Sequence, residues 1–133
     1  MSGAAELKAA GDACFRKGDL EGARKKYGEA LDVGGEVEDG FLSAVRNNRA
    51  ECALRLGQFE DALQDVGAVL DGSGGMGPEV RRKALFRKAR ALEGLGRLRE
   101  ALFCVKEVVG LSKGVEAAQK AAMDLGRRLA ERM

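Results

Sequence analysis

The sequence predicts an all-α protein, one domain over residues 1–133, built from three stacked helical hairpins and a final helix. The main observation is a glycine that recurs at Gly18, Gly57 and Gly96, at a spacing of 39 residues. Each copy is followed two residues later by a large apolar residue and five residues later by an alanine: Leu20 and Ala23, Phe59 and Ala62, Leu98 and Ala101. A fixed period of this length is typical of repeat proteins, in which stacked hairpins bury the apolar face that one hairpin leaves open.

Each repeat is predicted to be a pair of antiparallel helices. The glycine would end the first helix in a left-handed turn, and the alanine would let the second helix approach the first closely. The predicted first helices are 4–17, 38–56 and 79–95, and the predicted second helices are 20–32, 59–71 and 98–111. Apolar residues follow helical spacing in the first helices, at Leu7, Ala10, Gly11 and Cys14, at Ala50, Ala53 and Leu54, and at Leu85, Ala89 and Leu92. The repeats are therefore expected at about 4–37, 38–76 and 77–111.

A last helix is predicted over 114–132. Its apolar residues fall on one stripe, and its charged residues lie mostly elsewhere: Val115, Ala118, Ala122, Leu125 and Leu129 against Arg127, Arg128, Glu131 and Arg132. One apolar face and one polar face are what a helix needs to cap the end of a stack.

Composition argues against most kinds of enzyme. The chain has no histidine, the commonest general base and metal ligand, and no Gly-rich phosphate loop of the Lys-Ser/Thr type. Its three cysteines, Cys14, Cys52 and Cys104, are too far apart to indicate a disulfide framework or a zinc site. We therefore expect a binding module with no cofactor and no metal.

Charge and hydropathy bound the partners and the compartment. The 23 basic and 21 acidic residues leave a net charge of +2, too even for a general nucleic-acid or membrane binder. No leader-like segment opens the chain, and no apolar run approaches the ~20 residues that span a bilayer. We expect a cytoplasmic monomer with no nucleic acid and no membrane as partner.

The repeat resembles the tetratricopeptide (TPR) family. The small residues Gly11, Ala50 and Ala89, the turn glycines and the alanines that follow them match its consensus. The resemblance implies a right-handed superhelix of three hairpins plus a capping helix. The family repeat is ~34 residues long, so we expect extra residues between hairpins, at Val33–Glu38 and Asp71–Pro78, and longer first helices in repeats 2 and 3.

A set of polar residues resembles the dicarboxylate clamp of TPR co-chaperones. With the turn glycine as position 15 of each repeat, Lys8 is position 5, Asp12 position 9, Asn48 position 6, and Lys83 and Arg87 positions 2 and 6. Positions 2, 5, 6 and 9 share one helix face. The segment 83–98 looks most like the myosin-directed co-chaperones, and Hop-type adaptors and large immunophilins share the clamp.

The resemblance implies a ligand and a role for each residue. The ligand would be the acidic Glu-Glu-Val-Asp type tail of a ninety- or seventy-kilodalton heat-shock chaperone. Lys8 and Asn48 would hold its main-chain carboxylate, and Lys83, with Arg87 beside it, would contact the side chain of the last Asp.

One position departs from the clamp. Asp12 stands where the family has Asn, and a carboxylate repels the ligand carboxylate to which an amide would donate. Asp12 also lies four residues after Lys8, so we expect the two to pair.

Two further questions stay open at the sequence level. Phe15 and Phe86 line the groove or belong to the core. The chain is either a chaperone-tail adaptor or a generic TPR scaffold for an unrelated partner; an enzyme is the least favoured class.

Overall fold

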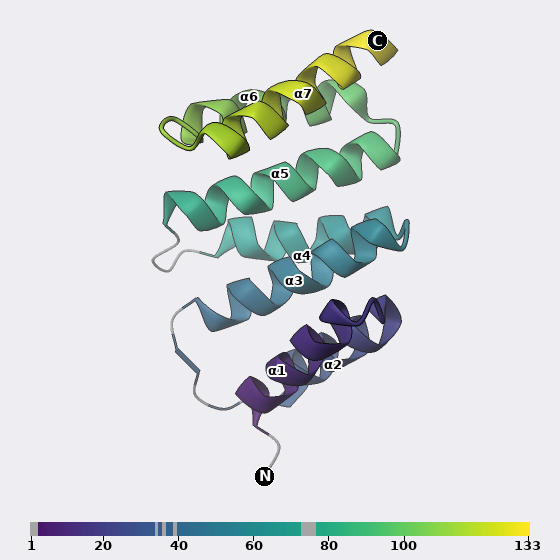
Figure 1. Cartoon of the computed structure of the whole chain (residues 1–133), viewed down its shortest axis with the longest axis vertical. Coiled ribbons are helices and arrows are strands. Elements are labelled where there is room, and N and C mark those ends of the chain that lie inside the picture. The colour runs from purple at the N-terminus through teal and green to yellow at the C-terminus, as the bar shows by residue number, and fades with distance from the viewer. Residues whose placement is uncertain (1–2, 34, 36, 39, 73–76) are drawn as a thin grey trace.

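The computed structural model describes residues 3–33, 35, 37–38, 40–72 and 77–133, and every regular element among them is an α-helix. Figure 1 shows the helices stacked in chain order, from the N-terminus at one end to the C-terminus at the other. The helices are α1 (Ala4–Arg16), α2 (Leu20–Val33), α3 (Phe41–Arg55), α4 (Phe59–Asp71), α5 (Pro78–Gly94), α6 (Leu98–Leu111) and α7 (Glu116–Arg132). This is the predicted all-α architecture of three hairpins and a final helix.

The three turn glycines adopt the conformation that the repeat predicts. Gly18, Gly57 and Gly96 have φ angles of 83°, 75° and 77°, in the left-handed region where only glycine is unstrained. The amide of the residue after each glycine then donates to a carbonyl five residues back, as from Gln58 to Ala53 over 2.8 Å. This bond closes the end of the first helix in every hairpin.

Two helices begin later than predicted. Helix α3 begins at Phe41 instead of residue 38, and α7 begins at Glu116 instead of residue 114. Gly40 and Gly114 both have a φ of 83°, which a right-handed helix cannot contain. The predicted inter-hairpin segments at 33–38 and 71–78 include residues 34, 36 and 73–76, which lie outside the described residues. Helix α5 has 17 residues, whereas α1 has 13. The first helix of repeat 3 is therefore longer than that of repeat 1, as expected.

Small residues set the distance between the helices of each pair. Ala23, Ala62 and Ala101 are fully buried where the second helix crosses the first. In the first hairpin, a Cβ at Gly11 would lie 2.6 Å from the ring of Tyr27, so only glycine fits beneath that ring. The buried Tyr27 is the largest side chain in the core of this hairpin.

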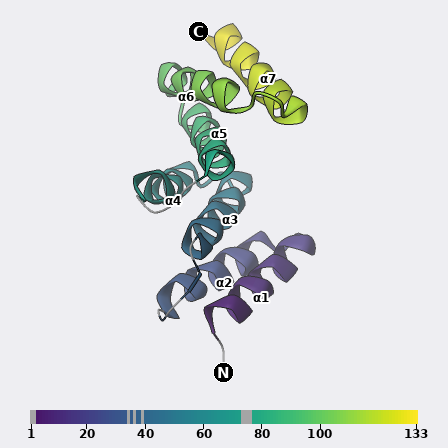
Figure 2. The same ribbon diagram turned by 90° about the vertical axis from the view of Figure 1, so that its left-hand side faces the viewer.

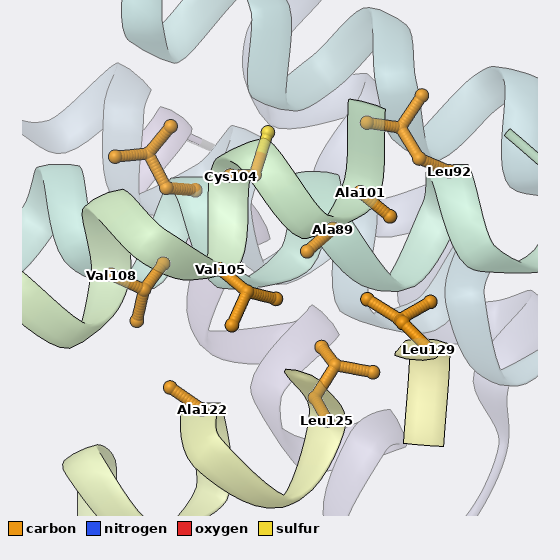
Figure 3. Close-up of a cluster of buried hydrophobic side chains, with 10 residues drawn as sticks. Ala89, Leu92, Ala101, Cys104, Val105, Val108, Ala122, Leu125 and Leu129 are labelled. Carbon is orange, nitrogen blue, oxygen red and sulfur yellow. The ribbon is translucent and has the colours of Figure 1, made fainter. Parts of the chain in front are cut away.

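Helix α7 caps the stack by completing the core of the third hairpin. Its buried residues Ala122, Leu125 and Leu129 face the side chains of α5 and α6, among them Leu92 and Val105 (Figure 3). Three residues of the predicted apolar stripe therefore pack, whereas Val115 lies before α7 and is exposed, and Ala118 lines a cavity. Within the described residues, no helix combines the length and the apolar character that crossing a bilayer requires.

Candidate functional site

A groove of about 680 Å³ runs along the first helices of the hairpins. In Figure 2, α4 projects to one side of α3 and α5, while α1 and α7 project to the other. Side chains from α1, α3 and α5 supply most of the lining, and Tyr27, Val108, Ala118 and Ala121 complete it from α2, α6 and α7. We call this cavity the groove.

The structure brings six of the seven predicted site residues to this groove. Asp12, Phe15, Asn48, Lys83, Phe86 and Arg87 all line it. Lys8 is not in the lining, but its Nζ lies 3.0 Å from Asp12 Oδ2, which places it at the edge. Residues separated by up to 75 positions thus face one cavity, because the repeat places equivalent helix faces side by side.

Asp12 is the best-anchored polar group at the α1 end of the groove. Its Oδ1 accepts hydrogen bonds from the hydroxyl of Tyr27 at 2.5 Å and, more weakly, from Nδ2 of Asn48 at 3.4 Å, and its Oδ2 pairs with Lys8. Burial alone would raise the pKa of Asp12, but the bonds from Tyr27 and Lys8 lower it below its ordinary value. Asp12 is therefore ionised and neutralises Lys8, as the i, i+4 spacing predicts.

Glu51 is a second carboxylate in the groove, which the sequence prediction missed. Its Oε1 accepts from Arg90 Nη1 at 2.8 Å and from Arg87 Nε at 3.1 Å, and its Oε2 accepts from Arg55 Nε at 3.0 Å. Burial alone would raise the pKa of Glu51, but the three arginines, Arg90 foremost, hold it down to about 2. The side chain is 14% exposed and stays charged at any physiological pH.

The two predicted cations of α5 differ in accessibility. Arg87 is largely buried, with 18% of its side chain exposed, and burial lowers the pKa of its guanidinium. Lys83 is half exposed, and it pairs at 3.0 Å with Glu79 in the first turn of the same helix. Solvent screens an exposed pair of this kind, so Lys83 is readily available to an incoming anion.

The groove as a whole is positively charged. Six cationic side chains and two carboxylates line it, an excess of four positive charges where the whole chain carries only +2: Arg16, Arg55, Arg82, Lys83, Arg87 and Arg90 against Asp12 and Glu51. A cleft lined by one sign of charge concentrates ligands of the opposite sign. Its chemistry is that of an anion-binding surface.

The two phenylalanines are both core and groove residues. Phe15 packs partly against the first-hairpin core and Phe86 against that of the third, and both line the groove. Arg55 lies over the Phe15 ring, 4.7 Å from its centroid. Together with Val108, Ala118 and Ala121, the rings give the charged groove an apolar contact surface.

The repeat register could have revealed two residues that the predicted site lacks, Glu51 and Arg90. Asp12, Glu51 and Arg90 are 39 residues apart, so all three occupy position 9, and the structure places all three in the groove. A lining role for one predicts a lining role for the others. Tyr27 could not be found in this way, since it belongs to a second helix and its ring lies against Gly11 of the first helix.

Comparison with known proteins places the fold in one class. No protein-family model matches the chain. It is 33% identical over 132 residues to sperm-associated antigen 1A of Danio rerio, covering 96% of this chain and 29% of that protein. The second TPR domain of human RPAP3, solved with the HSP70 peptide SGPTIEEVD, matches 96% of this chain and 98% of its own length, with 25% identity and a TM-score of 0.73. The chain is a tetratricopeptide repeat domain.

Within that class the similarity is to TPR domains of the co-chaperone type. The myosin chaperone UNC-45 from C. elegans, in a crystal structure with an Hsp90 peptide, is 28% identical over 99% of this chain, with a TM-score of 0.84. The match covers 14% of that protein, so the chain corresponds to one part of a much longer relative.

Proposed function

We propose that this domain is an adaptor that holds the acidic C-terminal tail of a heat-shock chaperone, of the Glu-Glu-Val-Asp type, in its groove. The observation that carries the proposal is the convergence of Asn48, Lys83 and Arg87, with Lys8 at the edge, on one positively charged cavity. Structures of similar TPR domains with Hsp90 and HSP70 peptides support it.

The ligand's carboxylates explain why these residue types are needed. A C-terminal Asp carries two carboxylates close together, and lysine, arginine and asparagine side chains donate hydrogen bonds to such groups. The resemblance assigns the main-chain carboxylate to Lys8 and Asn48 and the side chain to Lys83. Each charge-assisted bond contributes about 1.5–3 kcal/mol. After the cost of ordering a flexible tail, we expect roughly micromolar affinity, near 8 kcal/mol.

Asp12 is expected to weaken tail binding at the α1 end of the groove. It already engages Lys8 and Asn48, the two groups assigned to the main-chain carboxylate. A bound tail has to share these donors with Asp12, so the domain is expected to bind more weakly than one with an amide at this position.

The domain is also expected to lack several activities and kinds of partner. We infer a monomeric, cytoplasmic binding module that acts without catalysis, cofactor or metal, and whose partner is neither nucleic acid nor membrane. The absence of catalysis and metal is supported by a histidine-free sequence and by groove carboxylates that are already engaged, Glu51 by arginines and Asp12 by Lys8.

A peptide titration tests the proposal. A Met-Glu-Glu-Val-Asp peptide with a free C-terminus should bind, and its C-terminal amide should lose at least tenfold in affinity, because one carboxylate is gone. Lys83→Ala should weaken binding of the free acid. Lys106→Ala is the matched control, an exposed lysine of α6 that is not in the groove lining.

Equal affinity for the free acid and the amide would rule out recognition of the C-terminal carboxylate. The domain would then be a TPR scaffold for an unrelated partner.

A further inference from the structure

Position 9 of the repeat places a charged residue in the groove from each first helix. Asp12 on α1, Glu51 on α3 and Arg90 on α5 follow one another at the 39-residue period. Glu51 and Arg90 contact each other directly, with 2.8 Å between Oε1 and Nη1. The chain therefore carries its own carboxylate in the middle of the cavity that attracts anions.

Glu51 occupies the arginines of α5. Arg87 and Arg90 both donate to the same oxygen, Oε1, and Arg55 donates to Oε2. Three donors on one largely buried carboxylate make an arrangement that an incoming carboxylate cannot replace without leaving Glu51 buried and unpaired, which is costly. Glu51 thus stays on its arginines when a ligand enters.

Lys83 is in a different situation. Its partner Glu79 is 70% exposed and lies outside the groove lining. A ligand carboxylate can replace that exposed partner at little cost. Lys83 is therefore an accessible cation of α5, whereas Arg87 and Arg90 already share the carboxylate of Glu51.

We propose that Glu51 determines the specificity of the groove. It occupies Arg87 and Arg90 in place of a ligand carboxylate. The domain therefore recognises the terminal carboxylates of a tail, and acidic residues upstream add little affinity. This inference rests on the proposed function and adds the kind of tail that is preferred. The domain accepts peptides that keep the C-terminal Asp with neutral residues before it.

Two peptides test the inference on the unmodified chain. The first is Met-Glu-Glu-Val-Asp and the second is Met-Gln-Gln-Val-Asp, both with free C-termini. The wild-type chain should bind them within about threefold of each other, since Glu51 already occupies Arg87 and Arg90. A loss above tenfold on replacing the two glutamates would overturn the inference.

The Glu51→Gln variant should separate the two peptides. It keeps an oxygen acceptor for the arginines but removes the charge, so the preference for the glutamate peptide should rise to about tenfold or more. Glu93→Gln is the matched control: Glu93 is on the same helix as Arg90 and pairs with Arg128 of α7 at 2.7 Å, but it does not line the groove. It should keep the wild-type ratio. Circular dichroism establishes that each variant is folded, and if Glu51→Gln does not fold, the wild-type ratio decides.

The outcomes separate the two proposals. If the wild type binds the tail and Glu51→Gln leaves the ratio unchanged, the inference about Glu51 fails and the adaptor function stands. If neither chain binds either peptide, both fail.

Discussion

Single residues in the groove decide how strongly it attracts an anion. Asp12 is the clearest case, because the sequence alone indicates that it opposes the ligand and pairs with Lys8, and the structure shows that pair at 3.0 Å. In the structure, the hydroxyl of Tyr27 and the amide of Asn48 also donate hydrogen bonds to Asp12. Asp12 is therefore the centre of a small hydrogen-bond network.

Asp12→Asn is predicted to tighten binding of the free-acid tail. The change removes one negative charge, frees Lys8, and keeps an oxygen that can accept from Tyr27. We expect a gain of about 1 kcal/mol, roughly fivefold, measured by isothermal titration calorimetry. Weaker binding would mean that the tail does not lie near α1.

Glu51 should make the free energy of unfolding depend on pH in the acidic range. Its pKa is about 2 in the folded chain against an ordinary 4.5, so its stabilisation is fully present above about pH 4.5 and is lost as the pH falls toward 2. We expect Glu51→Gln to lower the free energy of unfolding by up to about 3 kcal/mol near pH 6. That difference should shrink toward zero near pH 2 in urea titrations. A difference that did not change with pH would contradict this assignment.

At the scale of the helices, turns are predicted better than helix starts. The three turn glycines and the buried alanines after them could be read from the period, because each depends on residues close in sequence. The late starts of α3 and α7 could not, since nothing local distinguishes Gly40 and Gly114 from the glycines inside helices. Tyr27 was missed for a related reason, since it reaches the groove from a second helix. The repeat register indicates that Glu51 lies in the groove, but its contacts with three arginines depend on how separate helices pack together.

Two glycine-to-alanine substitutions in one hairpin should change the free energy of unfolding in opposite directions. Gly57 has a φ of 75°, so alanine there should destabilise the fold by about 1–2 kcal/mol. Gly67 lies inside α4 with open space where a Cβ would go, so alanine there should stabilise by up to about 1 kcal/mol. Chemical denaturation measures both, and destabilisation by both would mean that the turn assignment does not explain the repeat glycine.

At the scale of the whole molecule, three hairpins turn a nearly neutral chain into one with a strongly positive groove. The stack gathers cations from α1, α3 and α5 on one side, and α7 closes the last core while lending Ala118 and Ala121 to the groove. The net charge does not show this charge separation. It arises because four cations of α5, namely Arg82, Lys83, Arg87 and Arg90, face the same cavity as Arg16 of α1 and Arg55 of α3.

The central claim is that the groove, and no other face, receives the carboxylate end of an acidic tail. Chemical-shift mapping tests it most directly, by titrating the ¹⁵N-labelled chain with a free-acid Met-Glu-Glu-Val-Asp peptide. The largest shifts should fall on Asn48, including its side-chain amide, and on the backbone amides around Lys8 and Lys83. Shifts gathered instead around Phe103, an exposed ring on α6 that is not in the groove lining, would contradict the account.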